Sequence, residues 1–450
     1  MRTVRKRRGL PVRGFQEGAH AGGEWLAVQA DFGYNTRIEF MRRNLVKSKN
    51  EKKNMVIAQS GGPTMVINAS LVGAVSTAMD IGKKKISGIY GARHGIQGIF
   101  DRDYVDMRKI SGAKLCRVAC TSSAALGSCR LKPTPEDCRR IFEEFKRKDV
   151  GYFFYIGGND SADTARIIGE EAERDGYPLI VYHIPKTIDN DLRSCDHTPG
   201  FASAARFVAR ALMGDDLDNR ALGGVKIDII MGRDAGFLTA ASALARTNKD
   251  SGPHLIYMPE RPFSLEGFVK DVQSVMKRIG RCVVAVSEGI RDAKGELFAK
   301  KFASGEMDSH GNLQLSGTGA LGDYLAGYLK AHSSIKRVRA DTFGYLQRSF
   351  PGLLTETDLQ EAWSVASSAV AAALDAADGG KSPQKGTIGL MRGKGRRYKA
   401  KYVAKPIQDA AKLTRSMPGE FIAKNGHDVT QAFIDYVKPL VGELPVCEVL

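Results

Sequence analysis

The feature that most constrains this chain is an alternation of strand-like runs with helical segments, which begins at Met55. The strand-like runs are short and rich in β-branched and aromatic residues, whereas the segments between them place apolar residues at helical spacing. Strands that alternate with helices along a chain usually form a parallel sheet covered by helices. The sequence therefore predicts an α/β fold with mostly parallel strands.

The strand-like pattern occurs nine times. The predicted strands are 55–59, 85–90, 151–156, 179–184, 226–231, 255–258, 281–287, 337–343 and 387–391. Helical spacing predicts packing helices over 65–79, 265–279 and 359–374. The stretch most similar to a linker is 379–386, which contains Gly-Gly, Ser-Pro and lysines.

Composition excludes several classes of protein. With 43% hydrophobic and 26% charged residues over 450 positions, the chain has the composition of a globular protein. Its apolar runs are shorter than the roughly 18 residues that a membrane helix needs, so no membrane association is expected. The seven cysteines form no CxxC pair, and the first residues lack an apolar leader, so we expect reduced thiols and a cytoplasmic protein.

The formal charge of +17 indicates an anionic partner. Residues 1–50 hold eleven basic and four acidic residues, which is +7 of that total. We interpret 1–50 as a basic extension, either disordered or the product of a misassigned start. No nucleic-acid motif with interleaved aromatic residues follows it, so phosphorylated small molecules are the expected anions and nucleic acid is not.

Two predicted strands end in glycine turns that open helices. The first turn is Ser60-Gly61-Gly62-Pro63-Thr64 and the second is Gly157-Gly158-Asn159-Asp160-Ser161. Glycine lets backbone N–H groups approach a phosphate, and the helix dipole favours its charge. Oxygen side chains at the second turn suit Mg²⁺. The alternative is structural: a plain turn at the first site, and a helix cap at the second.

A third strand end carries the most specific pattern in the chain. Its sequence is Pro185-Lys186-Thr187-Ile188-Asp189-Asn190-Asp191-Leu192. Two carboxylates two positions apart, next to a lysine, can accept a hydroxyl proton and orient the acceptor or a metal. A charged surface turn is the alternative.

Further polar residues follow later strands. Met231-Gly232-Arg233, Glu288-Gly289 and Tyr345-Leu346-Gln347-Arg348 each stand at or just beyond a strand end. Arg233, Arg339 and Arg348 could bind phosphate through paired hydrogen bonds, and Glu288 could accept sugar hydroxyls. Each arginine taken alone is more typical of a surface ion pair.

Together, in this order, these motifs resemble those of the 6-phosphofructokinase family over residues 55–352, and the C-terminal stretch 417–440 more loosely resembles the tail of pyrophosphate-dependent members. The resemblance implies two Rossmann-like three-layer domains. The pyrophosphate-binding domain is expected at 51–200 plus about 347–400, the fructose-6-phosphate domain at 201–346, and a C-terminal extension at 401–450.

Two positions separate phosphoryl donors in that family. ATP-using members typically carry glycine at both, whereas this chain has Asp160 and Lys186. A carboxylate at 160 would occupy the path of the nucleotide's α-phosphate and ribose, and Lys186 could bind the transferring phosphoryl group. The resemblance therefore implies pyrophosphate as donor.

The implied reaction is reversible phosphoryl transfer from pyrophosphate to the C1 hydroxyl of fructose 6-phosphate, with Mg²⁺ as cofactor. The implied catalytic residues are Asp189, Asp191, Lys186 and Asp160, and the implied diphosphate-binding residues are Gly62, Arg130 and Lys186. The implied sugar contacts are Thr187, Ile188, Asp189, Met231, Gly232, Arg233, Glu288, Arg339, Tyr345 and Arg348. Family members lend an arginine at the position of Arg339 to a neighbouring subunit, so a homodimer or homotetramer is expected.

One residue departs from the family pattern. Asn159 stands where an aspartate associated with Mg²⁺ is usual. Either Asp160 or a water-mediated contact then holds the metal at the Asn159–Asp160 site, or the metal affinity is weaker, or the chain is a catalytically poor regulatory subunit. An ATP-dependent 6-phosphofructokinase is the second alternative. A dinucleotide-dependent oxidoreductase is disfavoured because the chain offers no GxGxxG turn opening a helix.

Overall fold

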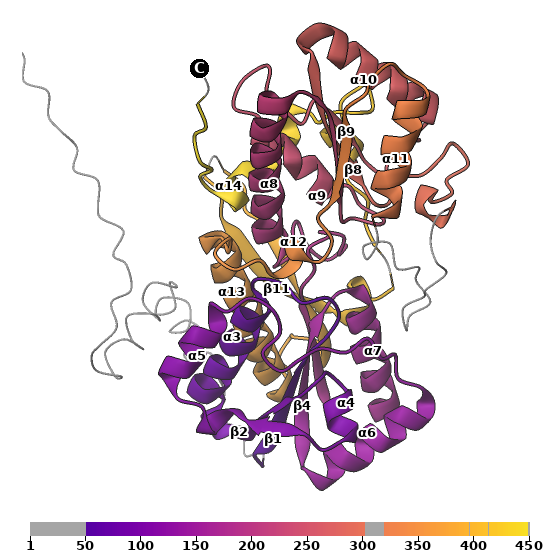
Figure 1. Cartoon of the computed structure of the whole chain (residues 1–450). Helices are drawn as coiled ribbons and strands as arrows, with labels where there is room; N and C mark the ends of the chain where they lie inside the picture. The colour runs from indigo at the N-terminus through magenta and orange to yellow at the C-terminus, as the bar shows by residue number, and fades with distance from the viewer. Residues whose placement is uncertain (1–50, 302–318, 396, 413, 449–450) are drawn as a thin grey trace, which may run out of the picture.

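The computed structural model describes residues 51–448 apart from 302–318, 396 and 413, so the predicted basic extension lies outside the described residues. The described chain forms a seven-stranded and a four-stranded sheet. Figure 1 shows them as two lobes, with the larger sheet in the lower lobe and the smaller sheet in the upper one. The predicted α/β class with mostly parallel sheets is confirmed.

The larger sheet has the strand order β11-β10-β5-β4-β1-β2-β3. Its strands are β1 (Lys53–Gln59), β2 (Ile86–Ala92), β3 (Tyr104–Asp106), β4 (Val150–Gly157), β5 (Ile180–Pro185), β10 (Lys385–Arg392) and β11 (Ala400–Pro406). The five inner strands pair in parallel, whereas β3 and β11 pair antiparallel at the two edges. The segment 379–386 is the turn that leads into β10, so it does not link two domains.

The smaller sheet has the order β7-β8-β6-β9, and all its pairs are parallel. Its strands are β6 (Gly224–Ile230), β7 (Leu255–Tyr257), β8 (Arg281–Ser287) and β9 (Val338–Thr342). The helices of the described chain are α3 (Ile67–Asp80), α4 (Gln97–Phe100), α5 (Gly112–Ala119), α6 (Pro135–Arg147), α7 (Asn159–Arg174), α8 (Phe201–Leu222), α9 (Phe237–Ala240), α10 (Leu265–Ile279), α11 (Ala320–Ala331), α12 (Leu346–Ser349), α13 (Glu356–Ala377) and α14 (Gln431–Val441).

Each sheet is covered by helices on both faces. Helices α3 and α13 bury one face of the larger sheet, and α6 and α7 bury the other. The two covering helices α3 and α13 cross closely at Gly73, where an added Cβ would lie 2.6 Å from the carbonyl oxygen of Trp363. Helices α10 and α11 cover one face of the smaller sheet and α8 covers the other, with α14 packed against α8. The result is two three-layer units.

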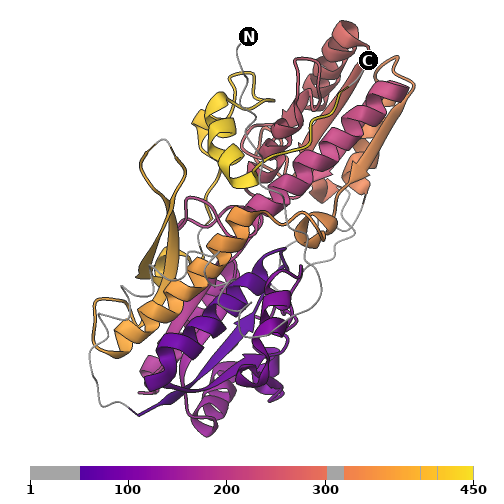
Figure 2. The same ribbon diagram turned by 90° about the vertical axis from the view of Figure 1, so that its left-hand side faces the viewer.

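The described residues after 399 contact both lobes. Strand β11 completes the edge of the larger sheet, and the β10–β11 hairpin projects from that lobe in Figure 2. Helix α14 packs in the core of the smaller lobe, with Phe433 and Val437 fully buried. The segment between them, 407–430, runs past the end of the larger sheet that carries the site described below.

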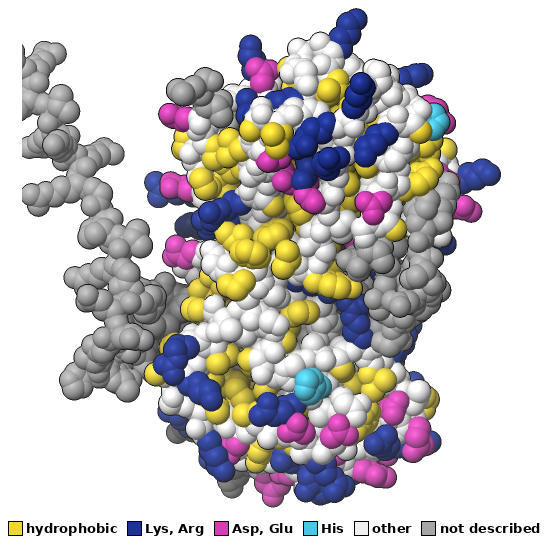
Figure 3. Space-filling view, viewed as in Figure 1, with side chains coloured by type: hydrophobic (Ala, Val, Ile, Leu, Met, Phe, Trp, Pro, Cys, Tyr) yellow, Lys and Arg dark blue, Asp and Glu magenta, His cyan; other side chains and the backbone are white. Residues whose placement is uncertain are grey.

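The surface carries no single basic stripe on the face drawn in Figure 3, where lysine and arginine side chains are spread over both lobes and mixed with acidic ones. Within the described parts of the chain, no helix is both long enough and apolar enough to cross a bilayer. All seven cysteines are free thiols.

Candidate active site

A pocket of about 240 Å³ lies where the carboxyl ends of strands from both sheets meet. Loops after β1, β4 and β5 of the larger sheet line it from one side, and loops after β6 and β8 of the smaller sheet line it from the other. The carboxyl ends of parallel strands are where open α/β sheets bind ligands. The sequence motifs therefore converge because parallel pairing brings all their strand ends to one place.

The turn after β1 is shaped around two cationic side chains. The Lys186 Nζ atom donates a 2.6 Å hydrogen bond to the carbonyl oxygen of Gly62. A Cβ at Gly62 would lie 3.1 Å from the guanidinium of Arg348, and Gly61 has a φ of +72°. A side chain at either glycine would strain the backbone or displace these cations. Because both positions are glycine, the backbone of the turn lies next to two positive charges.

The turn after β4 begins helix α7 at the pocket. Ser161 lies so close to Gly157 that any Cβ there would overlap its Oγ, and that Oγ donates to Ser60 Oγ at 2.9 Å. This bond joins the two glycine turns. The first turn of α7 carries Asn159 and the exposed Asp160, and the N-cap residue Gly158 makes no side-chain cap bond. The amino end of this helix gives the pocket a positive partial charge.

The loop after β5 supplies the acidic groups. Asp189 and Asp191 both line the pocket. Burial and the neighbouring charge of Asp189 raise the pKa of Asp191 to about 7. Burial also raises the pKa of Asp189, although Arg348, Arg233 and Lys186 act in the opposite direction. At neutral pH this pair of carboxyl groups can therefore hold or release a proton, as general acid–base chemistry requires.

Lys186 is 3% exposed and sits between positive neighbours. Burial, followed by the charges of Arg348 and Arg130, lowers the pKa of Lys186 to about 7. An anion in the pocket would supply a counter-charge that offsets the effects of burial and of the neighbouring arginines on the pKa of Lys186. This lysine is therefore suited to bind a polyanion such as a phosphate.

Most of the residues singled out from the sequence line this one pocket. They are Gly62, Arg130, Asn159, Asp160, Lys186, Thr187, Ile188, Asp189, Met231, Arg233, Glu288, Arg348 and Asp191. Three others lie elsewhere. Gly232 has its carbonyl turned back to accept from Ser287 Oγ at 2.6 Å. Tyr345 is 49% exposed, with the Arg348 guanidinium over its ring at 4.6 Å.

Arg339 is the third residue outside the pocket. It is exposed on β9, the edge strand of the smaller sheet, and donates to the carbonyl oxygen of Val338.

Sequence reasoning missed two polar residues that line the pocket. Asp234 lies there and forms an ion pair with Arg291 at 2.6 Å. Asp234 directly follows Arg233 at a strand end, and this position could have predicted that it lines the pocket. Thr414 comes from the C-terminal segment and pairs with Leu192 in an isolated antiparallel bridge. No local motif marks Thr414, because its position depends on the path of a loop far away in the sequence.

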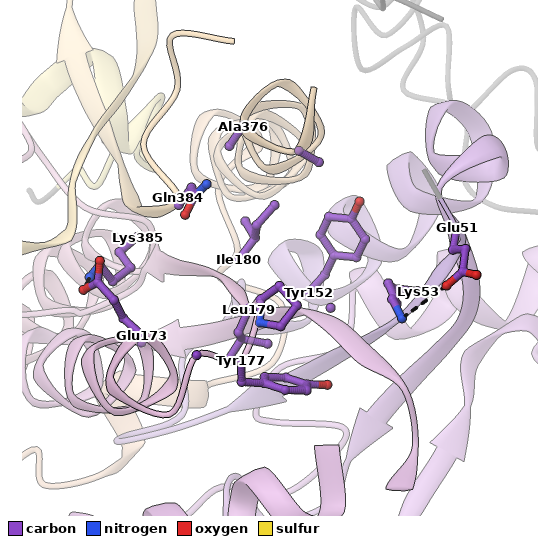
Figure 4. Close-up of a pocket in the computed structure, with 15 residues that line it drawn as sticks. Glu51, Lys53, Tyr152, Glu173, Tyr177, Leu179, Ile180, Ala376, Gln384 and Lys385 are labelled. Atoms are coloured by element: carbon purple, nitrogen blue, oxygen red, sulfur yellow. Dashed lines mark hydrogen bonds and ion pairs between the residues drawn. The ribbon is translucent and has the colours of Figure 1, made fainter. Parts of the chain in front are cut away.

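A second hollow, of about 590 Å³, opens at the other end of the larger sheet (Figure 4). It lies by the amino ends of β1, β4 and β5, where α/β sheets rarely bind ligands. Its lysines are already paired: Lys53 lies 2.6 Å from Asp149 and 3.9 Å from Glu51, and Lys385 lies 2.5 Å from Glu173. Although larger, it lacks the converging groups of the first pocket.

Comparison with known proteins shows the family of this chain. The family described as Phosphofructokinase matches residues 54–373, most of the described chain. The chain therefore belongs to the phosphofructokinase family.

Several similar relatives carry a pyrophosphate-dependent name. The pyrophosphate–fructose 6-phosphate 1-phosphotransferase of Rhodospirillum rubrum is 52% identical over 87% of this chain and 95% of its own length. The enzyme of the same name from Xanthomonas campestris is 38% identical over 87% of this chain and 93% of its own length. A crystal structure of the pyrophosphate-dependent phosphofructokinase of Nitrosospira multiformis has a TM-score of 0.76 and 32% identity, covering 88% of this chain and 95% of its own.

Proposed function

We propose that this chain is a pyrophosphate-dependent phosphofructokinase. It transfers a phosphoryl group reversibly from pyrophosphate to the C1 hydroxyl of fructose 6-phosphate, giving fructose 1,6-bisphosphate and phosphate. The observation that carries the proposal is the contact of Lys186 with the Gly62 carbonyl, in a pocket that also contains Asp160. We propose that the donor is selected at these two positions, and four similar relatives, which are 34% to 52% identical, carry the pyrophosphate name.

In the proposed reaction, Asp189 accepts the proton of the sugar's C1 hydroxyl. The C1 oxygen at the same time attacks the nearer phosphorus of pyrophosphate. The bond from that phosphorus to the bridging oxygen breaks, and phosphate leaves with the electron pair. Asp191 shares the proton of the carboxyl pair and orients Asp189, which its raised pKa allows. Positioning and charge neutralisation supply most of the catalysis in such a transfer.

The donor binds against the glycine turn after β1. Backbone at Gly62, the Arg130 guanidinium and the Lys186 ammonium face that space from three loops. A unit-charge contact at about 4 Å is worth on the order of 4 kcal/mol at an effective dielectric near 20, before desolvation. The side chain of Asp160 narrows the same end of the pocket, so ATP is excluded by steric and like-charge conflict.

Mg²⁺ fits this site as an ion that arrives with pyrophosphate. The Asn159 Oδ1 atom already accepts from the Asp160 backbone N–H at 2.9 Å, so the Asp160 carboxylate is the stronger oxygen ligand. In the described residues no three acidic side chains converge here as they do at Asp215, Asp228 and Asp341. Mg²⁺ is commonly held by one or two carboxylates plus phosphate oxygens. Bound in that way, it would neutralise charge on the donor.

The sugar binds between the loop after β5 and the smaller lobe. The proposed contacts that line the pocket are Thr187, Ile188, Asp189, Met231, Arg233, Glu288 and Arg348, and the proposed contacts Gly232 and Tyr345 lie beside it. Arg339 points from an exposed sheet edge outside the pocket. It can reach a sugar phosphate only in a neighbouring copy of the chain, so the proposed enzyme is a homodimer or homotetramer.

Exposed apolar side chains support such an interface. Leu217 and Leu222 of α8 are 37% and 59% exposed, and Leu346 and Phe350 at α12 are 62% and 40% exposed. Figure 3 shows hydrophobic side chains in several places on the face that it draws. Exposed large apolar side chains are typical of protein–protein contacts where they gather into a patch.

The test is a donor assay on purified protein. Fructose 6-phosphate is supplied with Mg²⁺ and with either pyrophosphate or ATP, and fructose 1,6-bisphosphate is measured. Turnover with pyrophosphate alone supports the proposal. Turnover with ATP alone would identify the ATP-dependent alternative. No turnover with either donor would favour the regulatory-subunit alternative that Asn159 suggests. The cytoplasmic location stays a prediction.

A further inference from the structure

We propose that Arg415 and Tyr436 are positioning residues that hold Asp189 and Asp191 in their working geometry. This inference rests on the proposed function of that carboxyl pair. Both residues lie in the C-terminal segment, beyond residue 373 where the match to the family ends. Neither residue lines the pocket itself, so each acts through the loop after β5.

The residue between the two carboxylates is the point of contact. Asn190 is fully buried, and it does not line the pocket that its neighbours Asp189 and Asp191 line. Its φ is +59°, in the left-handed region that side chains rarely adopt and that asparagine tolerates better than most. Such a conformation persists when the surroundings determine it. Contacts with other parts of the chain therefore hold Asn190 in this left-handed conformation.

The C-terminal segment supplies most of the contacts. Arg415 Nε donates to the Asn190 carbonyl oxygen at 2.9 Å, and Arg415 Nη2 donates to Asn190 Oδ1 at 3.1 Å. The Asn190 Nδ2 atom donates to the Tyr436 hydroxyl at 2.8 Å. The backbone N–H of Arg415 donates to the Asp191 carbonyl oxygen at 2.8 Å. Asn190 is thus bound on its main chain and at both ends of its amide.

Arg415 and Tyr436 are themselves fixed. The Arg415 guanidinium lies over the Phe237 ring at 4.8 Å and also donates to the Asp196 carbonyl oxygen. The Tyr436 hydroxyl donates to that same oxygen at 2.8 Å. Burial raises the pKa of Tyr436 to about 12, so its hydroxyl keeps its proton and remains a donor at working pH. A pre-ordered support of this kind is what transfers rigidity to a catalytic loop.

Loss of this support has a defined consequence. Asp189 and Asp191 flank the constrained residue, so a change of φ at Asn190 turns one carboxylate relative to the other. Displacing a reacting group by about 1 Å can cost on the order of 100-fold in rate. Binding of the two substrates depends mainly on Arg130, Lys186 and the loops after β6 and β8, which this change leaves in place.

The test compares Tyr436→Phe and Arg415→Lys with Asp428→Ala. The control residue lies in the same C-terminal segment and pairs with Arg246 at 2.8 Å, away from the loop after β5. We expect the first two variants to lose about 10- to 100-fold in kcat, with both KM values changed less than about threefold. Asp428→Ala should keep its kcat. Added guanidinium should partly restore Arg415→Ala, and a crystal structure of that variant should show Asn190 outside the left-handed region.

Several results would overturn the inference. These are an unchanged kcat in both Tyr436→Phe and Arg415→Lys, an equal loss in Asp428→Ala, or an Asn190 conformation that survives in Arg415→Ala. The comparison uses whichever donor the wild-type protein accepts, so an error in the proposed donor leaves this test intact. If the wild-type protein turns over neither donor, the crystal structure alone decides.

Discussion

The Nζ atom of Lys186 lies 2.6 Å from the carbonyl oxygen of Gly62. This bond joins the loop after β5, which carries the two carboxylates, to the glycine turn after β1. The bond places the Lys186 ammonium between the proposed donor and acceptor sites. The geometry explains why a glycine turn and a lysine that are far apart in the sequence act as one unit.

Removing this cation should reduce pyrophosphate use selectively. Lys186→Met keeps the length of the side chain and removes its charge, and we expect kcat/KM for pyrophosphate to fall by about 100-fold or more, since a single close charge contact is worth several kcal/mol. Steady-state kinetics measures this. Lys385→Met is the matched control, because Lys385 pairs with exposed Glu173 at the far end of the sheet. An equal loss in both variants would show that the effect is not local.

The pH dependence of the reaction should be bell-shaped near neutrality. The pKa of Asp191 is raised to about 7, so kcat/KM should rise with pH as the carboxyl pair loses its shared proton. The pKa of Lys186 is lowered to about 7, so kcat/KM should fall again as the ammonium is lost. Bound pyrophosphate stabilises the ammonium, so the alkaline limb of kcat should lie at higher pH than that of kcat/KM. A Lys186→Arg variant whose alkaline limb is unmoved would contradict this assignment.

Stability should also depend on pH through His197. Burial alone would lower its pKa, but the carboxylates of Glu361 and Asp196, at 2.6 and 2.8 Å, outweigh burial and raise it to about 9. A histidine with a raised folded-state pKa contributes its full stabilisation below about 6.5 and loses it as pH rises through about 9. The rise in the pKa of His197 corresponds to a stabilisation of the folded state of roughly 3 kcal/mol at most.

Urea unfolding at pH 6.5 and pH 9.5 checks the contribution of His197. The free energy of unfolding of the wild-type protein should fall between these values by more than that of His197→Gln. The exposed His332 gives the control variant His332→Gln, which should follow the wild-type protein. Equal pH dependence in His197→Gln and wild type would refute the ion-pair account.

The shared-site proposal predicts complementation between two inactive variants. Arg339→Ala lacks the lent arginine and Asp189→Asn lacks the base, so each alone should have little activity. In a mixed dimer, one site receives Asp189 from the first variant and Arg339 from the second. Refolding equal amounts together should restore about a quarter of wild-type activity, since half of the dimers are mixed and each has one complete site. No recovery from mixtures that do form dimers would place Arg339 outside the neighbouring site.

The sequence predicted the local structure well where the signals were local. Helix α10 spans the predicted 265–279 because Ser264 caps its start, accepting from the Gly267 N–H at 3.0 Å, and Gly280 ends it with a φ of +76°. Strands β4 and β8 were predictable because every residue in them is buried, so each has an apolar run in the sequence. The carboxyl ends of the predicted parallel strands then had to meet, which made the site predictable as well.

The edge strands and the C-terminal contacts were not predictable in this way. Strand β3 has three residues and β11 is half-exposed, so neither has an uninterrupted apolar pattern. Thr414 lines the pocket, and Arg415 and Tyr436 contact the loop after β5 from behind it. These are contacts between segments far apart in the sequence, which no local motif encodes. The predicted basic extension at 1–50 lies outside the described parts of the chain.

The central claim is that Asp160 and Lys186 together select pyrophosphate over ATP. The most direct measurement is the ratio of kcat/KM for pyrophosphate to kcat/KM for ATP, in the wild-type protein and in the Asp160→Gly/Lys186→Gly double variant. The account predicts that this ratio falls roughly 1,000-fold, which corresponds to about 4 kcal/mol, through loss of pyrophosphate use and gain of ATP use. A ratio that stays the same in the double variant would contradict it.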